Sequence, residues 1–250
     1  MALGAIVLLS QPNSSSAALV TPPELAPADL ATGFSLGKAD APVKIEMWED
    51  LQCTACGLFS RQIEPRIVTQ YVVPGTVQLT FNDFAFIGSE VHGGKMPTAF
   101  GQDESVDAAI AARCAGAQGP GNFWHFQQYL YWNQGTENGG KFTKAFFDKI
   151  ASAMGLDRTT FDSCLTDSTQ LKAVISQTEQ GQRQGINATP TLFINGTKVM
   201  VSTYDQLAAD IDAAAKGQPL PSTGAGSSVP ETTVAPSAAP AASPAASATP

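Results

Sequence analysis

Two cysteines separated by two residues, Cys53 and Cys56, are the side chains of this chain best suited to chemistry. They stand where a strand pattern gives way to a helix pattern, which places them at the first turn of a predicted helix. The free amides and partial positive charge of a helix N-terminus stabilise a thiolate there. A thiolate attacks disulfides, and a stabilised thiolate is also a good leaving group. The pair therefore predicts thiol–disulfide exchange, with Cys53 as the exposed nucleophile and Cys56 as its buried partner.

Two other uses of this cysteine pair fit the sequence less well. A purely structural disulfide is disfavoured by the strand-to-helix placement and by a distant Thr189-Pro190. Structural zinc would need a second close pair of ligands. The remaining cysteines are far apart and the two histidines form no such pair; these residues are Cys114, Cys164, His92 and His125. No metal and no cofactor are expected.

Length and composition indicate one globular domain that carries an insertion. The chain has 250 residues, is 43% hydrophobic and carries a formal net charge of −8. An acidic protein with 14 basic residues is a poor candidate for binding nucleic acid or anionic membranes. Its two ends differ in composition from the middle, and both are expected to lie outside the globular part.

The expected organisation has five parts. Residues 1–41 are interpreted as the remnant of a secretory signal or anchor, with an apolar run at 2–9, followed by a linker rich in Ser, Pro and Ala. Residues 42–101 and 186–216 form the two halves of one α/β unit, and residues 102–185 form a helical insertion. Residues 217–250 have no aromatic residue and one charge, so they are predicted to be disordered.

Hydrophobic periodicity supports this α/β arrangement. Alternating patterns predict strands at 43–48, 77–81, 191–194 and 198–201, and Asn195-Gly196 is a strong hairpin signal. A helix is predicted from Cys53 to Tyr71, kinked or shortened by Pro65. The middle is helical, with caps at Thr143 and Asp157. A closing helix is predicted with Tyr204, Leu207 and Ile211 at helical spacing. The order β-α-β, helical block, β-β-α predicts a mixed sheet with one large insertion.

Several separated segments resemble one known family. VKIEMWEDLQCTAC at 43–56 resembles the first strand and redox turn of DsbA-type thiol–disulfide oxidoreductases of the thioredoxin superfamily. Arg113-Cys114-Ala115, Phe123-Trp124 and residues 155–164 resemble the helical insertion of its extracytoplasmic bacterial members. Residues 185–191, GINATPT, resemble the cis-proline segment. The resemblance covers about residues 39–214 and implies a thioredoxin fold interrupted by a helical domain.

The resemblance also implies roles for individual residues. Pro190 is expected to be cis and to lie against the redox pair, and the Thr189 hydroxyl is expected to tune the site. The catalytic set is therefore Cys53, Cys56, Thr189 and Pro190, with Thr54 and Ala55 between the cysteines. Cys114 and Cys164 are expected to form a structural disulfide between two helices of the insertion, as suits an oxidising compartment.

The chain departs from the family pattern at two places. The family often carries a buried acid six positions before the first redox cysteine, where this chain has Met47. Glu46 is one place earlier and should point to the opposite face of the strand. Strong oxidants of the family have a histidine between the cysteines, so the Cys53 pKa is expected to be lowered without being extreme. Glu49 and Asp50 are expected to solvate the turn or to raise this pKa slightly.

The expected function is an exported, monomeric oxidase that introduces disulfides into reduced or unfolded exported proteins. A membrane quinone-linked reoxidase, DsbB-like or VKOR-like, would restore its disulfide. A reductase or isomerase is the nearest alternative, because the redox direction depends on a potential that sequence does not supply. A copper carrier or a holdase for unfolded chains is the alternative of another class. The aromatic segment at 123–132 is expected to be core, with His125 structural or on the surface and His92 in a loop.

Overall fold

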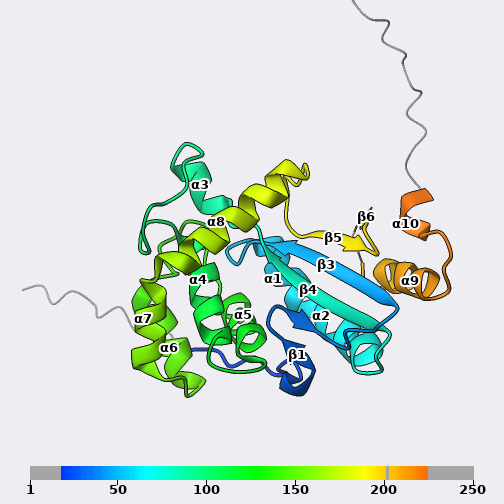
Figure 1. Ribbon diagram of the computed structural model, residues 1–250, viewed down its shortest axis with the longest axis horizontal. Coiled ribbons are helices and arrows are strands. Elements are labelled where there is room, and N and C mark those ends of the chain that lie inside the picture. Colours follow the sequence, from blue (N-terminus) through cyan, green and yellow to red (C-terminus); the bar gives the residue numbers. More distant parts are fainter. Residues whose placement is uncertain (1–17, 201–202, 225–250) are drawn as a thin grey trace, which may run out of the picture.

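The computed structural model describes residues 18–200 and 203–224, so the apolar run at 2–9 and residues 225–250 of the expected tail lie outside the described residues. A six-stranded mixed sheet forms its centre, in the order β1-β2-β4-β3-β5-β6 (Figure 1). β3 and β4 are parallel and every other pair is antiparallel. The strands are β1 (Ala31–Thr32), β2 (Ser35–Leu36), β3 (Val43–Glu49), β4 (Val77–Asp83), β5 (Thr191–Ile194) and β6 (Thr197–Val199). The predicted α/β class is confirmed.

The connection from β3 to β4 is helical, as a parallel pair requires. It comprises α1 (Thr54–Gln62), α2 (Glu64–Ile67) and the π-helical turn η2 (Val68–Val72). Pro65 lies in the first turn of α2, where a missing amide costs no hydrogen bond. The long helix predicted from Cys53 is therefore divided just before its proline.

All regular secondary structure between β4 and β5 is helical. It contains α3 (Ile87–Val91), α4 (Glu104–Gly116), α5 (Asn122–Trp132), α6 (Lys144–Ala153), α7 (Arg158–Leu165) and α8 (Ser168–Arg183). The predicted caps are confirmed, because Thr143 accepts from the amide of Phe146 and Asp157 from that of Thr160. The alanine-rich α4 is buried along most of its length, which allows α5 to pack closely against it.

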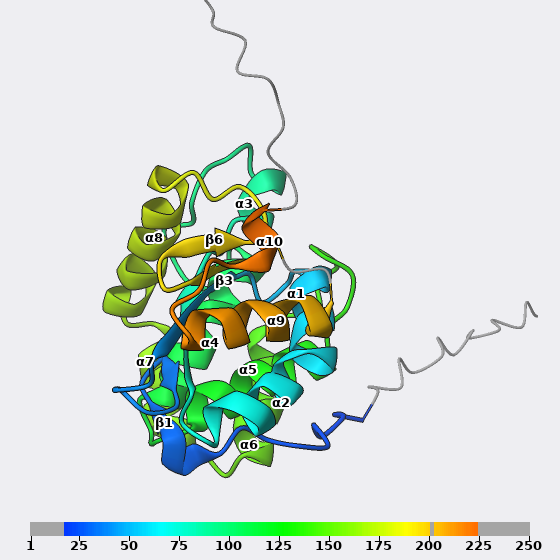
Figure 2. The same ribbon diagram turned by 90° about the vertical axis from the view of Figure 1, so that its right-hand side faces the viewer.

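Helices cover both faces of the sheet. Figure 2 shows α1, α2 and the closing helix α9 (Tyr204–Ala215) on one side and α8 on the other. β3 alternates accordingly: Val43, Ile45 and Met47 belong to the larger core, whereas Trp48 joins a second cluster with Phe84 and Ile186. The alternation decides which side chains of this strand can face α1, the helix that carries the cysteine pair.

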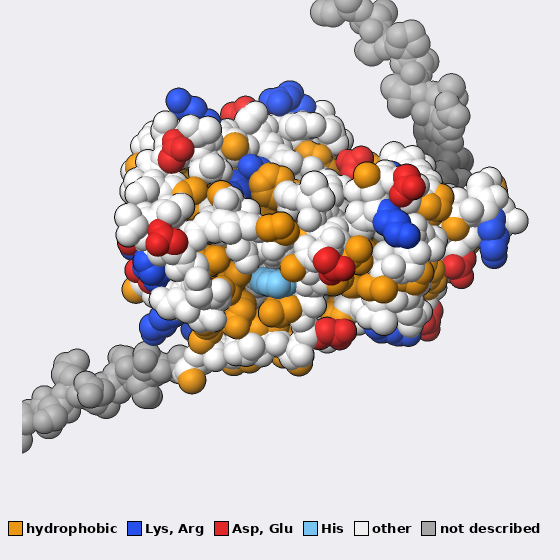
Figure 3. Space-filling model, turned by 60° about the horizontal axis from the view of Figure 1, so that its bottom comes forward, with side chains coloured by type: hydrophobic (Ala, Val, Ile, Leu, Met, Phe, Trp, Pro, Cys, Tyr) orange, Lys and Arg blue, Asp and Glu red, His pale blue; other side chains and the backbone are white. Residues whose placement is uncertain are grey.

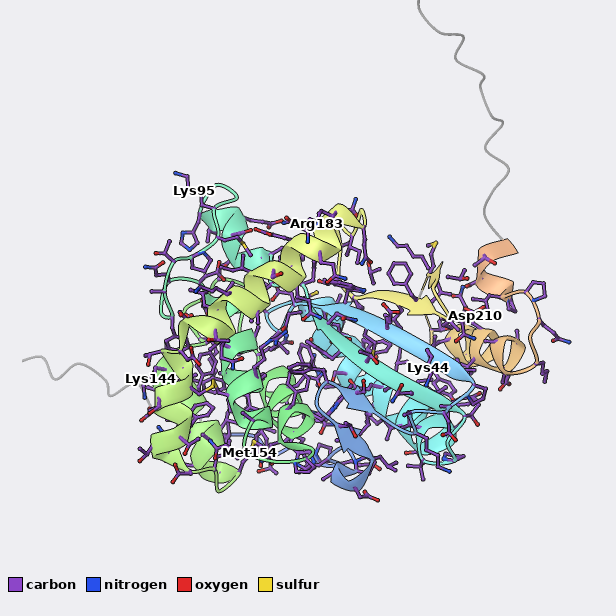
Figure 4. The ribbon with its side chains drawn as sticks, viewed as in Figure 1. Lys44, Lys95, Lys144, Met154, Arg183 and Asp210 are labelled. Atoms are coloured by element: carbon purple, nitrogen blue, oxygen red, sulfur yellow. A yellow bond between two sulfur atoms is a disulfide. The ribbon has the colours of Figure 1, made fainter. Side chains whose placement is uncertain are left out.

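Two segments near the ends are more ordered than predicted. The expected linker before residue 42 contains the 3-10 helix η1 (Ala28–Leu30) and the β1–β2 hairpin, which extends the sheet beside β4. Two-residue strands are too short to leave a periodic pattern. Within the expected tail, α10 (Pro221–Gly224) lies against α9, where the buried carboxylate of Asp210 accepts from the Ser222 amide at 2.9 Å (Figure 4).

The aromatic segment of α5 is core, as predicted. Phe123, Trp124, Phe126 and Tyr131 are no more than 1% exposed. His125 contacts the carbonyl oxygen of Ala26 at 2.7 Å and therefore has a structural role. No helix among residues 18–200 and 203–224 combines the length and apolar character needed to cross a bilayer.

Candidate active site

The cysteine pair lies at the start of α1, directly after the turn that follows β3. Cys53 is the N-cap, and its sulfur accepts from the amide of Cys56 at 3.4 Å. Thr54 and Ala55 form the exposed first turn, while Cys56 is fully buried. Both cysteines of the pair are free thiols in this structure. The predicted placement at a helix N-terminus is thus observed.

The Thr189–Pro190 segment reaches this helix from the far end of the chain. The peptide bond between these residues is cis, and the Thr189 carbonyl oxygen lies 3.4 Å from the sulfur of Cys53, whose thiol donates to it. The Thr189 hydroxyl oxygen is buried and has no partner of good hydrogen-bond geometry within the described residues. This coverage leaves Cys53 only 6% exposed. The expectation of an openly exposed nucleophile was therefore wrong.

The two sulfurs have opposite protonation tendencies. A hydrogen bond from the Cys56 thiol, helped by the Thr189 side chain and by the amides of Cys56 and Ala55, outweighs burial and lowers the pKa of Cys53 from 9.0 to about 6. Burial raises the pKa of Cys56 well above its ordinary value, and the nearby Glu49 carboxylate adds to the effect. At neutral pH the first sulfur is a thiolate and the second a thiol.

Glu49 is the buried acid that sequence reasoning missed. It lies two positions after Met47, so the two side chains project from the same face of β3, about 6.5 Å apart along the strand. Its carboxylate accepts from the hydroxyl of Tyr131 at 2.6 Å, and both side chains are essentially unexposed. The expectation that Glu49 solvates the turn was wrong, whereas the alternative, a like-charge interaction with Cys53, is present. The two-residue period of a strand, applied from Met47, would have identified Glu49. Glu46, by contrast, is exposed.

A second buried carboxyl, that of Glu64, interacts with Glu49. Glu64 is 1% exposed, and neither of its carboxyl oxygens has a geometrically good hydrogen-bond partner within the described residues. Burial is the main cause that raises the pKa of Glu64 to about 7, and it raises the pKa of Glu49 well above the ordinary value, with repulsion by Glu64 contributing. Glu49 acts on Cys56 and Glu64 acts on Glu49, so these two carboxyls with raised pKa values can hold a proton near that sulfur at neutral pH.

Asp50, the neighbour of Glu49, has a structural role. Being 1% exposed, it accepts from the amides of Gln52, Phe86 and Ile87 at 2.8, 2.9 and 3.0 Å. Burial outweighs these hydrogen bonds and raises its pKa to about 7. Asp50 therefore fixes the turn before Cys53 to the segment after β4, and the expectation that it solvates the turn was wrong.

A loop of the helical insertion is hydrogen-bonded to the redox turn. The amide group of Gln134 donates to the carbonyl oxygens of Leu51 and Cys53, each at 3.0 Å. Asn138 donates its backbone amide to the Gln52 side chain at 2.7 Å. Gly57 permits the close approach of Gln134, because a Cβ at position 57 would lie 2.0 Å from the Gln134 side-chain oxygen. No motif in the sequence pointed to this contact between the insertion and the turn.

The other cysteines lie away from the redox pair. A disulfide joins Cys114 of α4 to Cys164 of α7, with a Cα–Cα distance of 5.7 Å. Beside it, Arg113 forms a buried ion pair with Asp83 at 2.6 Å, which ties α4 to the end of β4. Among the residues that the structure describes, no cluster of three His, Cys, Asp or Glu side chains could hold a metal ion.

Comparisons with known proteins agree with this geometry. The family model described as Thioredoxin matches residues 29–213, so the chain belongs to that family. Disulfide bond formation protein D of Bacillus subtilis is 26% identical over 185 residues, which are 73% of this chain and 77% of that protein. These findings confirm the predicted DsbA-type resemblance and the predicted activity class, a thiol–disulfide oxidoreductase.

Solved structures show the same fold. Oxidised BdbD from Bacillus subtilis has a TM-score of 0.64 at 24% identity, covering 77% of this chain and 97% of its own. Reduced DsbA from Mycobacterium tuberculosis has a TM-score of 0.54 at 23% identity, covering 75% of this chain and 96% of its own. The thioredoxin fold interrupted by helices is therefore confirmed.

Proposed function

We propose that this protein is an extracytoplasmic dithiol oxidase that passes the Cys53–Cys56 disulfide to reduced or unfolded exported proteins. The observation that carries the proposal is the difference between the two sulfurs. Cys53 meets a helix N-terminus and the Thr189–Pro190 segment, and its pKa is lowered to about 6, whereas burial keeps Cys56 protonated. A stabilised Cys53 thiolate favours the reduced enzyme, so the oxidised enzyme gives its disulfide away readily.

The reaction begins with the oxidised pair. A substrate thiolate attacks the sulfur of Cys53, forming a mixed disulfide and breaking the bond to Cys56. The released Cys56 sulfur takes up a proton, which the neighbouring Glu49 carboxyl can donate. A second substrate thiolate then attacks the substrate sulfur of the mixed disulfide. Cys53 leaves as a thiolate, the substrate holds a new disulfide, and the enzyme holds the two electrons.

The surroundings of Cys53 suit an extended polypeptide as substrate. The Thr189 carbonyl oxygen lies 3.4 Å from the reacting sulfur, so the chain on either side of it borders the approach to that sulfur. Acidic and basic side chains are scattered singly over the face shown in Figure 3, with no continuous basic surface there. The proposed substrates are polypeptides, and the formal net charge of −8 disfavours nucleic acid as a partner.

Turnover requires a partner that reoxidises the enzyme. We assign this role to a membrane quinone-linked oxidoreductase, DsbB-like or VKOR-like, and place the protein outside the cytoplasm as a monomer. Support comes from the disulfide between Cys114 and Cys164, a kind of cross-link that persists in oxidising compartments. The name of the Bacillus subtilis relative, disulfide bond formation protein D, supports a role in disulfide formation.

The test is oxidation of a reduced, unfolded substrate by the purified, oxidised protein. Wild-type protein should introduce disulfides stoichiometrically, Cys53→Ser should abolish the reaction, and Cys114→Ser should retain it. Equal loss in both variants would contradict the assignment of roles. The redox equilibrium of the pair against glutathione separates an oxidase from a reductase, because a reductase would stay oxidised where an oxidase becomes reduced.

A further inference from the structure

The N-terminus of α1 shares its free amides between two negatively charged acceptors. The sulfur of Cys53 takes the amide of Cys56, at 3.4 Å, and is stabilised further by that of Ala55. The amide of Thr54 donates instead to a carboxylate oxygen of Glu137, at 2.9 Å. A thiolate and an exposed carboxylate therefore lie at the same helix end, although they are 84 positions apart in the sequence.

Neighbouring contacts hold Glu137 in this place. Three positions earlier, Gln134 binds the carbonyl oxygens of Leu51 and Cys53. On the next residue, Asn138 binds Gln52 through its backbone amide and the Ile87 carbonyl oxygen through its side chain. The loop is thus attached to the redox turn on both sides of Glu137, which fixes the distance between its carboxylate and the start of α1.

We propose that Glu137 is a positioning residue. Its carboxylate partly offsets the positive charge at the N-terminus of α1 that stabilises the Cys53 thiolate, and it thereby makes the Cys53–Cys56 disulfide a weaker oxidant. The inference rests on the proposed function, because it concerns the same exchange reaction. It assigns to the helical insertion a role in setting the redox equilibrium of the thioredoxin unit. The residue acts on the reacting sulfur only through the helix.

The direction of the effect follows from charge. The reduced enzyme carries the Cys53 thiolate, whereas the oxidised enzyme carries no charge on either sulfur. A nearby carboxylate therefore destabilises only the reduced state and shifts the equilibrium towards the disulfide. A charge at an exposed helix N-terminus changes an equilibrium by about two- to five-fold, and salt screens this effect. Glu49 on β3 also repels the Cys53 thiolate, but Glu49 is buried, so salt hardly screens its effect.

The experiment compares Glu137→Gln, which keeps a hydrogen-bond acceptor without the charge, with Glu137→Ala, which removes both. Two quantities are measured in the full chain: the equilibrium constant against glutathione, and the pH midpoint of the thiolate's ultraviolet absorbance. Glu179→Gln, an exposed and distant acid on α8, is the matched control for net charge.

Both Glu137 variants should lower the absorbance midpoint and shift the glutathione equilibrium about two- to five-fold towards the reduced enzyme at low salt. The difference from wild type should shrink at about 1 M salt, where screening acts within a few ångströms. The control should match wild type. A Glu137→Gln variant identical to wild type would overturn the proposal, even if Glu137→Ala differs, because the role would then be hydrogen bonding alone. A wild-type pair that does not exchange with glutathione would instead contradict the proposed function itself.

Discussion

The Tyr131 hydroxyl donates to the Glu49 carboxylate at 2.6 Å, and this contact joins the inserted helices to the strand that leads into the redox turn. Both side chains are buried, so the hydrogen bond is made in a medium that penalises an unpaired charge. This hydrogen bond lowers the pKa of Glu49, against burial and against repulsion by Glu64, which raise it. The protonation state near Cys56 thus depends on a residue of the insertion.

Tyr131→Phe should destabilise the protein by about 1–3 kcal/mol, because it leaves a buried carboxyl oxygen of Glu49 without its donor. Denaturant unfolding at neutral pH measures this loss. In a Glu49→Gln background the same substitution should cost less, since an amide oxygen is a weaker acceptor than a carboxylate. Equal losses in the two backgrounds would show that the hydroxyl does not act through Glu49.

Glu64→Gln should change the pH dependence of stability. The pKa of Glu64 is raised from 4.5 to about 7, so the folded state holds its proton more tightly than the unfolded state. Below 4.5 both states are protonated and the wild type loses nothing. As the pH rises from 4.5 to about 7 the wild type loses up to about 3 kcal/mol, and the loss is constant above that range. The variant should not show this loss.

Denaturant unfolding across that range, with wild type and variant side by side, measures the difference. Glu64→Gln should gain on wild type as the pH rises, whatever its stability in acid. Parallel curves for the two proteins would contradict the raised pKa. Asp148→Asn, on the exposed ion-pair network that Lys144 and Arg158 form with it, is the comparison for a carboxyl that is not buried.

The Cys53 thiol should titrate with a midpoint of about 6 in the reduced protein. Its pKa is depressed on folding, so the stabilisation is fully present above 9.0, the ordinary value, and is lost as the pH falls through about 6. Reduced wild type should therefore lose stability relative to Cys53→Ser over that interval. Alkylation rates give an independent measure, because only the thiolate reacts. A midpoint near 9.0 would remove the basis for assigning Cys53 as the nucleophile.

Cys114→Ser with Cys164→Ser should lower the free energy of unfolding by about 2–5 kcal/mol, as the loss of a native disulfide generally does. The double variant should still oxidise a reduced substrate at the wild-type rate under conditions where it is folded, because this bridge lies apart from the Cys53–Cys56 pair. Thermal unfolding and a substrate oxidation assay measure the two effects. A folded double variant without activity would assign the bridge a part in electron transfer.

Some features of this protein were determined by local sequence. Strand alternation, caps and the Asn195-Gly196 turn depend on neighbouring residues, so β3, β5 and the helices that begin after Thr143 and Asp157 were predictable. The cysteine pair was predictable for the same reason, since a strand followed by a helix places two residues of that spacing on its first turn. The short β1–β2 hairpin was missed, because two residues make no pattern.

Other features were decided only by tertiary structure. Glu49 and Asp50 were expected to solvate the turn, but both are buried, and Asp50 anchors the turn. Cys53 is covered by Thr189. Glu137 lies in the loop that follows α5, far from α1 in the sequence, and it accepts from the first amide of α1. Desolvation and contacts between distant residues depend on how whole elements pack. A single sequence read locally contains the residues that take part but not the distances between them.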